Sequence, residues 1–202
     1  MQLIIISGKI GSGKSTFSKY FQKKSYHYIN SDILAKNIIQ NNKYVSNKLN
    51  KEFNILDNKK KLSLKILKTI LLSSKENQNK INSIVHPFFY KELNLILRKS
   101  NHNKIVLELP LIETSGNIKY NSKIVTIKTK LEIRKHRYLT KSTSKAQDFI
   151  ILNKYQKSSS YYEKYSDYVI SNNDTMETLQ TRFNKLYSKL KEWIAYQIIR
   201  FH

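Results

Sequence analysis

Residues 8–15 read Gly8-Lys9-Ile10-Gly11-Ser12-Gly13-Lys14-Ser15 and fit the pattern G-x-x-x-x-G-K-[ST]. An apolar run precedes them and a helical pattern follows. Three of the chain's four glycines lie here, which allows left-handed backbone conformations at one turn. We expect backbone N–H groups and a helix N-terminus to cradle a phosphate, with Lys14 on the outer phosphates and Ser15 on Mg²⁺. The stretch predicts a nucleoside triphosphate site, against the alternative of a turn without ligand.

Composition sets limits on the rest of the chain. Its 202 residues suit one domain with a lobe or lid and allow a sizeable core. The absence of cysteine excludes disulfides and thiolate metal sites, which agrees with a cytoplasmic protein. The start at Met1-Gln2 leaves no room for a signal peptide, and no apolar run is long enough to span a bilayer. We therefore expect a cytoplasmic protein without membrane contact.

The net charge of +23 raises the question of a nucleic-acid partner, because a cationic surface attracts phosphate polymers. Lysine is spread along the whole chain with abundant Asn, Ile and Tyr, as an AT-rich coding sequence produces, and no dense basic block stands out. We expect no specific nucleic-acid function and a small-molecule substrate instead. The sequence gives no indication of the oligomeric state.

A second strand, residues 27–30, is followed by Ser31-Asp32, which can cap a helix with Ile33, Leu34, Ile38 and Ile39 on one face. Ligands of open parallel sheets bind beyond the carboxyl ends of the strands. Asp32 is therefore expected to face the same crevice as residues 8–15. A catalytic role is favoured over a role as helix cap alone.

Residues 41–61 are polar and read as a variable connection, whereas residues 62–99 have a helical pattern that suggests a substrate lobe. His86-Pro87 is expected to break this pattern, with the proline in the first turn of a new helix. His86 is either a substrate contact or a residue that packs at the helix junction.

A third strand, residues 104–109, ends at Pro110, and a fourth covers residues 123–127. Glu108 either orients waters bound to Mg²⁺ or faces the sheet edge. Beyond the fourth strand we interpret a basic helix and a Ser/Thr/Lys-rich stretch as a mobile lid, in which Arg134, Arg137 and Lys141 approach phosphates on closure. A solvated basic helix face is the alternative.

The last third of the chain completes the pattern. A helix is predicted over residues 146–156, a fifth strand over residues 167–170, and a long amphipathic helix from Thr175 onward. The apolar residues of this last helix recur at helical spacing and are expected to pack on the sheet. They are Leu179, Phe183, Leu186, Leu190, Trp193 and Ile194.

Several motifs, taken in order, are those of a known family. They are Gly8–Thr16, Ile29–Ala35, Ile84–Pro87, Leu109–Glu113, Arg137, Gln156 and Asp167–Asn172. Through them the chain resembles dephospho-CoA kinase from residue 1 to about residue 186. The resemblance implies an α/β P-loop kinase fold, with a five-stranded parallel sheet flanked by helices, a helical substrate lobe and a mobile lid. It also implies transfer of the ATP γ-phosphate to the 3′-hydroxyl of dephospho-CoA, the last step of coenzyme A biosynthesis, with Mg²⁺.

The resemblance also assigns roles to residues. It implies that Asp32 receives the hydroxyl proton, and we expect Lys14, Arg137 and Lys141 to be the other catalytic residues. ATP binds to Gly8, Lys9, Ile10, Gly11, Ser12, Gly13, Lys14, Ser15 and Thr16, with Ser15 on the metal. The acceptor binds to Asp32, His86, Pro87 and Glu113. The chain departs from the family pattern at Lys9 and Asn30, in a Pro110–Glu113 loop one residue short, and at Lys141 and Tyr162.

The expected domain division is a single kinase domain. Its core comprises residues 1–40, 101–137 and 153–202, its substrate lobe about residues 59–100, and its lid about residues 138–152. Two other functions stay open. One is a P-loop kinase of a nucleoside or nucleoside monophosphate, and the other is a P-loop ATPase with an RNA-binding or regulatory role.

Overall fold

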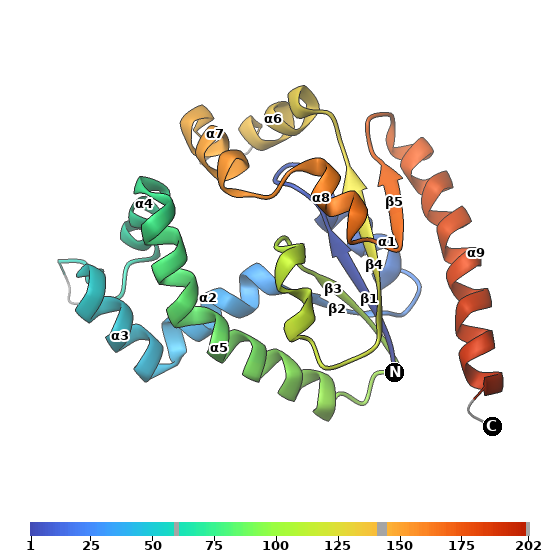
Figure 1. Cartoon of the computed structure of the whole chain (residues 1–202), viewed down its shortest axis with the longest axis horizontal. Helices are drawn as coiled ribbons and strands as arrows, with labels where there is room; N and C mark the ends of the chain where they lie inside the picture. The colour runs from blue at the N-terminus through green and yellow to red at the C-terminus, as the bar shows by residue number, and fades with distance from the viewer. Residues whose placement is uncertain (59–60, 141–144, 201–202) are drawn as a thin grey trace.

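A five-stranded, all-parallel β-sheet forms the centre of the protein, as the sequence predicted (Figure 1). The computed structural model describes residues 1–58, 61–140 and 145–200, and of residues 194–200 only the backbone. The strands are β1 (Gln2–Ser7), β2 (His27–Asn30), β3 (Lys104–Glu108), β4 (Ser122–Lys128) and β5 (Tyr168–Ser171), in the spatial order β2-β3-β1-β4-β5. All strands run in one direction, so their carboxyl ends share one edge, where ligands bind in such sheets.

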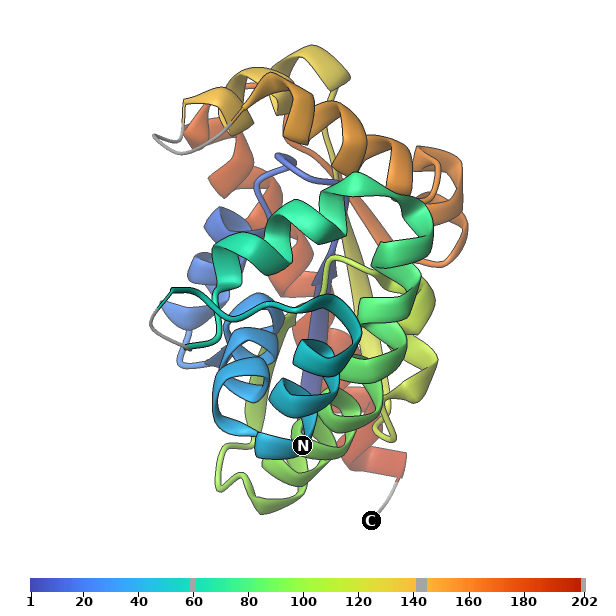
Figure 2. The same cartoon turned by 90° about the vertical axis from the view of Figure 1, so that its left-hand side faces the viewer.

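Helices cover both faces of the sheet (Figures 1 and 2). They are α1 (Lys14–Gln22), α2 (Ser31–Asn41), α3 (Lys43–Phe53), α4 (Leu64–Ser73), α5 (Lys75–Lys99), the 3₁₀ helix η1 (Ile112–Asn117), α6 (Leu131–Leu139), α7 (Ala146–Tyr155), α8 (Ser159–Lys164) and α9 (Met176–Arg200). Buried side chains of α1 and α9 pack on one face, and those of α2 and α5 pack on the other. Figure 2 looks onto the lobe that α3, α4 and α5 build beside the sheet.

Strand β1 shows why a continuous apolar run predicts the middle of such a sheet. Leu3 and Ile5 belong to the core on the α2 and α5 side, whereas Ile4 and Ile6 belong to the core on the α1 and α9 side. Successive side chains of a strand point to opposite faces, and both faces of this sheet are covered, so all four central positions of β1 are apolar.

Helix α9 confirms the amphipathic pattern at the end of the chain. Leu179, Phe183, Leu186 and Leu190 are all buried in the core that α1 shares. Trp193 is half-buried, and Lys123 Nζ lies 5.4 Å from its ring centroid. The side chain of Ile194 lies outside the described residues.

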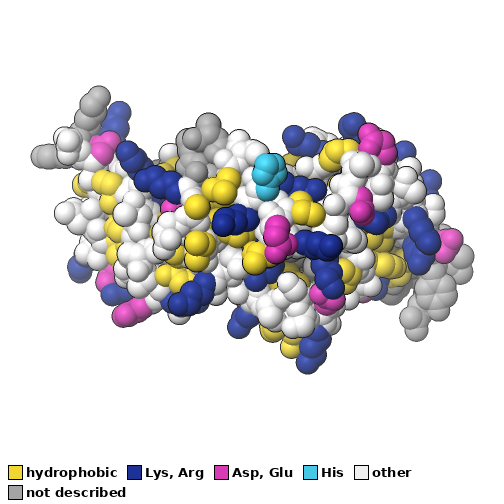
Figure 3. All heavy atoms as spheres, turned by 90° about the horizontal axis from the view of Figure 1, so that it is seen from above, with side chains coloured by type: hydrophobic (Ala, Val, Ile, Leu, Met, Phe, Trp, Pro, Cys, Tyr) yellow, Lys and Arg dark blue, Asp and Glu magenta, His cyan; other side chains and the backbone are white. Residues whose placement is uncertain are grey.

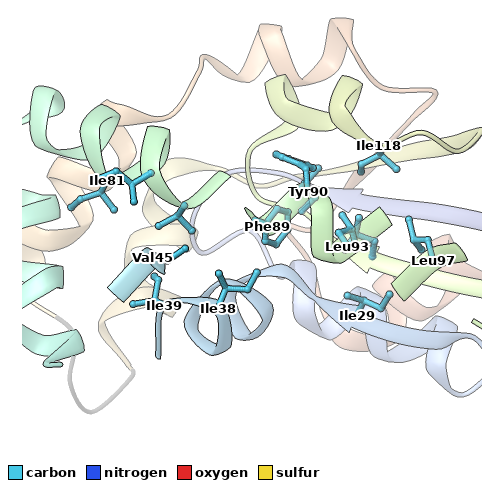
Figure 4. Close-up of a cluster of buried hydrophobic side chains, with 14 of the residues drawn as sticks. Ile29, Ile38, Ile39, Val45, Ile81, Phe89, Tyr90, Leu93, Leu97 and Ile118 are labelled. Carbon is cyan, nitrogen blue, oxygen red and sulfur yellow. The ribbon is translucent and has the colours of Figure 1, made fainter. Parts of the chain in front are cut away.

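The interpretation of residues 41–61 as a variable connection was wrong for much of its length, which is helical. Helix α3 occupies Lys43–Phe53, and its Val45 and Leu49 are fully buried. These residues share a hydrophobic core with α2 and α5, part of which Figure 4 shows. Two apolar side chains four residues apart anchor this helix on the core. Because the residues between and around them are mostly polar, the sequence shows only a weak helical pattern here.

The predicted break at His86-Pro87 was also wrong, because α5 runs from Lys75 to Lys99 with Pro87 inside it. A proline removes one intrahelical hydrogen bond and crowds the carbonyl four residues earlier, at Ser83. Buried residues on both sides of it, among them Val85 and Phe89, pack into one core. Burial of this apolar face outweighs the local penalty of the proline.

The start of α2 needs a third correction. Its cap is Asn30, whose Oδ1 accepts hydrogen bonds from the backbone N–H groups of Asp32 (2.9 Å) and Ile33 (3.1 Å). Ser31 and Asp32 therefore lie in the first turn of the helix and do not cap it. Ile33 is 58% exposed and does not share the buried face of Ile38 and Ile39. Asparagine suits the cap position because its side chain accepts from helix amides that lack partners.

Candidate active site

The loop between β1 and α1 has the backbone that the glycine pattern requires. Gly11 and Gly13 have φ angles of 77° and 96°. A Cβ at Gly11 would lie 2.4 Å from the carbonyl oxygen of Arg134, and one at Gly13 would lie 2.3 Å from Asn172 Nδ2. Glycine is therefore needed here for both conformation and space.

Residues distant in sequence hold this loop in place. The backbone N–H of Ile10 donates to Gln156 Oε1 at 2.8 Å. The carbonyl of Ser12 accepts from Asn172 Nδ2 at 2.8 Å and from Thr129 Oγ1 at 3.0 Å. Sequence reasoning gave Gln156 and Asn172 only as parts of family motifs. Their contacts identify them as supports of the phosphate loop.

The first expected lid cation, Arg134, has a different place from the one predicted. It is 5% exposed, and its guanidinium donates to the backbone carbonyls of Thr129 (3.1 Å) and Ile10 (3.2 Å) and to Asn153 Oδ1 (2.9 Å). These bonds join α6 and α7 to the phosphate loop. Arg134 is thus a structural residue, which corrects the expectation that it approaches phosphates on lid closure.

Arg137, one turn further along α6, lies near the N-terminus of α1. Its Nη1 donates to the carbonyl of Asn172 at 3.1 Å and lies 3.8 Å from the Cβ position of Gly13. It is half-buried. A cation at this place adds to the positive end of the helix dipole, where an anion binds. Lys141, the other lid cation of the sequence prediction, lies outside the described residues.

Helix α7 lies against the lobe that contains α4 and α5. Lys68 Nζ of α4 forms an ion pair with Asp148 Oδ2 of α7 at 2.7 Å. Lys75 Nζ of α5 donates to the carbonyl of Tyr155 at 3.0 Å. The segment expected to form a lid therefore connects the lobe with the loop supports of α6, and its mobility stays a prediction.

Ser15, Glu108, Tyr28 and Asn30 form a polar network beside the loop. Ser15 Oγ donates to Glu108 Oε1 at 2.9 Å. The other carboxylate oxygen, Oε2, accepts from the Tyr28 hydroxyl and, at 3.3 Å, from Asn30 Nδ2. Register explains the meeting, because Asn30 of β2 pairs with Glu108 of β3 in the sheet. The structure thus places the Glu108 carboxylate beside Ser15, and its role in orienting waters bound to Mg²⁺ stays a prediction.

This network suits a divalent cation that arrives with a nucleotide. Glu108 is 6% exposed, and no ion pair within the described ranges includes it. No group of three or more His, Cys, Asp or Glu among those residues could hold a metal alone. Mg²⁺ usually keeps several waters and takes one or two protein ligands with substrate phosphates. A serine hydroxyl and a buried carboxylate meet that requirement.

A mostly apolar cavity of about 220 Å³ lies between the lobe and the sheet. Its apolar lining includes Ile39, Leu67, Leu71, Ile81, Val85 and Phe89, and its polar lining includes Ser31, Asp32, Asn82, His86, Tyr90 and Thr114. Ser31 Oγ is buried and, in the part of the chain that the structure describes, has no hydrogen-bond partner. The exposed Asp32 carboxylate likewise lacks one there, so both groups are available to a ligand.

The other expected acceptor residues divide around this cavity. His86 lines it, and burial lowers the pKa of its imidazole while the charge of Glu113 opposes the shift, so His86 is neutral at pH 7. Glu113 is exposed at the start of η1, near His86 and outside the lining. Pro87 is exposed and does not line the cavity either, so of the four expected acceptor residues only Asp32 and His86 line it.

Tyr162, one of the departures from the family pattern, is a core residue. It is 1% exposed, and its hydroxyl donates to the carbonyl of Pro110 at 2.8 Å. Burial raises the pKa of its phenol, so the group stays protonated and acts as donor. This residue ties α8 to the loop after β3.

The face above the carboxyl edge of the sheet carries scattered charge (Figure 3). Lys and Arg side chains are spread over it with acidic side chains between them, as the even distribution of lysine along the sequence indicated.

Among the described helices, none is long and apolar enough to cross a bilayer.

Replacing Gly11 by alanine is expected to weaken ATP binding by about tenfold or more. The new Cβ would meet the Arg134 carbonyl, and the positive φ adds strain of roughly 1–3 kcal/mol. Calorimetric titration with ATP checks this, together with the melting temperature. Gly116→Ala is the matched control, because a Cβ there has no neighbour within 4 Å and should change neither quantity. Unchanged ATP affinity in Gly11→Ala would contradict the assignment of the loop.

A glycine-rich loop between the first strand and the first helix of a parallel sheet, with Lys14 and Ser15 at its end, defines a P-loop kinase fold. The family model of dephospho-CoA kinase matches residues 2–178. The chain belongs to the dephospho-CoA kinase family, and it is an ATP-dependent kinase of the transferase class. Family membership also connects it with coenzyme A biosynthesis.

Individual relatives agree with this family. Dephospho-CoA kinase of Fusobacterium nucleatum is 33% identical over 184 residues, which cover 89% of this chain and 93% of the relative. Two solved structures show the same fold. Dephospho-CoA kinase from Campylobacter jejuni has a TM-score of 0.67 at 23% identity and covers 95% of this chain and 98% of its own. Shikimate kinase from Bacteroides thetaiotaomicron has a TM-score of 0.55 at 13% identity, and the match covers 94% of this chain and 98% of that structure.

Proposed function

We propose that the protein transfers the γ-phosphate of ATP to the 3′-hydroxyl of dephospho-CoA, which gives coenzyme A and ADP. The observation that carries this proposal is the position of Asp32. Its carboxylate lies at the carboxyl end of β2 and lines the cavity between lobe and sheet. The phosphate loop follows β1 at the same edge. An acceptor in the cavity can therefore present a hydroxyl group between the two.

On the nucleotide side, the backbone from Gly8 to Thr16 binds the phosphates. Lys14 neutralises charge on the outer phosphates, and its Nζ donates to the carbonyl of Lys9 at 3.3 Å. Ser15 and Glu108 would hold the Mg²⁺ that accompanies ATP. When bound, the metal ion neutralises charge that develops on the phosphates. Arg137 adds positive charge beside the phosphate loop, and a charge contribution from Lys141 stays a prediction.

On the acceptor side, the apolar cavity takes the acceptor molecule, and Asp32 orients its ribose hydroxyl. As the new bond from that oxygen to the γ-phosphorus forms and the bond to the β,γ-bridging oxygen breaks, the hydroxyl proton passes to Asp32. Phosphoryl transfer needs little covalent help, so positioning and charge neutralisation supply most of the acceleration. Ser31, His86 and Glu113 offer hydrogen-bond and charge contacts around the cavity mouth.

Replacing Lys14 by alanine is expected to lower kcat by about a hundredfold while the fold is kept. The lysine charge meets phosphate oxygens whose negative charge grows toward the transition state, so its loss acts on kcat. Steady-state kinetics with a saturating acceptor, alongside a melting curve, measure both properties. Near wild-type turnover in a folded Lys14→Ala protein would remove the loop lysine from the mechanism.

An acceptor panel tests the proposed function. Purified protein is incubated with ATP and Mg²⁺, and ADP release is followed with dephospho-CoA, adenosine, nucleoside monophosphates and RNA added one at a time. Stimulation by dephospho-CoA alone, with phosphate recovered on the ribose 3′-oxygen, supports the proposal. Stimulation by nucleosides or nucleotides, or by RNA, would replace it with a nucleotide kinase or an RNA-dependent ATPase.

A further inference from the structure

Glu108 is fixed by hydrogen bonds from three residues on two separate elements. Ser15 of α1 donates to its Oε1, and Tyr28 and Asn30 of β2 donate to its Oε2. Asn30 Nδ2 also donates to the Tyr28 hydroxyl at 3.0 Å. A buried carboxylate needs such donors, because burial removes its hydration. The two donors on Oε2 leave Oε1 directed at Ser15.

Tyr28 is suited to hold this carboxylate. Its place in β2 is set by pairing with Val106 of β3, and its ring packs against the core that α1 and α9 share. From this position its hydroxyl donates to Glu108 Oε2.

The network also connects the two sides of the site. The Asn30 Oδ1 atom accepts from the backbone N–H of Asp32, while its Nδ2 donates to Glu108 and Tyr28. A continuous chain of hydrogen bonds thus runs from Ser15, at the end of the phosphate loop, to the backbone of Asp32. Tyr28 donates to the same carboxylate from outside this chain, and its hydroxyl can be removed without loss of the ring.

We propose that Tyr28 is a positioning residue for the divalent cation that accompanies ATP, because its hydroxyl holds the Glu108 carboxylate toward Ser15. Tyr28 acts through Glu108 and does not contact the reacting atoms. Groups that orient metal-binding side chains commonly change metal affinity or activity by about 10- to 100-fold when removed. The inference rests on the proposed function only in that ATP binds here with a divalent cation, and it requires no particular acceptor.

The test measures binding and not turnover. The affinity of the full chain for ATP is determined by calorimetry at saturating Mg²⁺ and again in EDTA, and the ratio of the two is the coupling to the cation. Tyr28→Phe is expected to reduce this ratio by about tenfold or more, with affinity in EDTA within about twofold of wild type. Tyr26→Phe is the matched control. It removes another buried hydroxyl, whose partner is Gln2 Oε1 at 3.3 Å, and should leave the ratio unchanged.

A double-mutant cycle separates positioning from a general effect on the site. In a Glu108→Gln background, Tyr28→Phe should lower the coupling ratio no further, because the carboxylate it positions is gone. If Tyr28→Phe and Glu108→Gln instead reduce the coupling ratio independently, so that the double variant loses the product of the two single effects, the proposal is overturned. An unchanged ratio in folded Tyr28→Phe would overturn it too. A Tyr28→Phe protein that does not fold would overturn it as well, since the hydroxyl would then serve folding. The binding measurement contains no acceptor, so a negative acceptor panel would not change its outcome. Likewise, an unchanged coupling ratio in Tyr28→Phe would not contradict transfer to dephospho-CoA.

Discussion

Replacing Asp32 by asparagine is expected to lower kcat by about 10²–10⁴-fold, with ATP affinity little changed. Asparagine keeps the shape of the side chain but loses the base and the negative charge. Asn30 and not Asp32 caps α2, so the substitution leaves the cap bonds to the N–H groups of Asp32 and Ile33 in place. The loss should therefore appear in turnover and not in stability. Kinetics, ATP titration and melting temperature of the same preparation measure the three quantities.

A cap variant provides the control for Asp32. Asn42 caps α3 through a hydrogen bond from the Val45 N–H at 3.1 Å, away from the proposed site. Asn42→Ala should lower stability by about 1 kcal/mol and leave turnover per folded molecule unchanged. If Asp32→Asn behaves like Asn42→Ala, with a lower melting temperature and normal turnover, Asp32 is not the base. The acceptor hydroxyl would then need another partner along the cavity.

Replacing Arg137 by alanine is expected to lower kcat on the order of 10³-fold, the range for arginines that stabilise a transferring phosphoryl group. Its guanidinium lies beside Gly13 at the N-terminus of α1 and can grip two phosphate oxygens at once. Arg134 on the same helix provides the contrast. Arg134→Ala leaves three acceptors without their donor and should lower stability by roughly 2–4 kcal/mol.

The two arginine variants are compared at equal concentrations of folded protein. Arg137→Ala should keep the wild-type melting temperature, and Arg134→Ala should lower it. Lys141→Ala is expected to reduce kcat about tenfold, and Lys141→Arg to hold or raise it, because the planar fork suits phosphate better than a point charge. Turnover within twofold of wild type for both Arg137→Ala and Lys141→Ala would mean that this segment is a solvated basic helix.

The glycine pattern and the strands were readable from sequence because their signals are local. Gly8 to Ser15 combines residue types that only a phosphate loop brings together, and the apolar run before it fits a strand buried on both faces. The end of β2 placed Asp32 at the carboxyl edge, which follows from strand direction alone. The order of short motifs then gave the family.

Elements with weak or conflicting local signals were misread. Helix α3 has only two fully buried residues, Val45 and Leu49, among polar neighbours. Pro87 argues locally for a break, yet α5 continues because its apolar face is buried along its length. In both cases the free energy of tertiary packing exceeds the local preference. A short stretch of sequence does not show which distant residues will pack against it, so this contribution could not be predicted.

By itself, the sequence determined the sheet, the phosphate loop, the family and the edge at which Asp32 lies. The tertiary structure decided which side chains meet there: Glu108 with Ser15 and Tyr28, Arg134 as a support, and Arg137 beside the loop. The physical reason is distance along the chain. Glu108 and Ser15 are separated by 93 positions, and only strand order and register bring their oxygens to 2.9 Å.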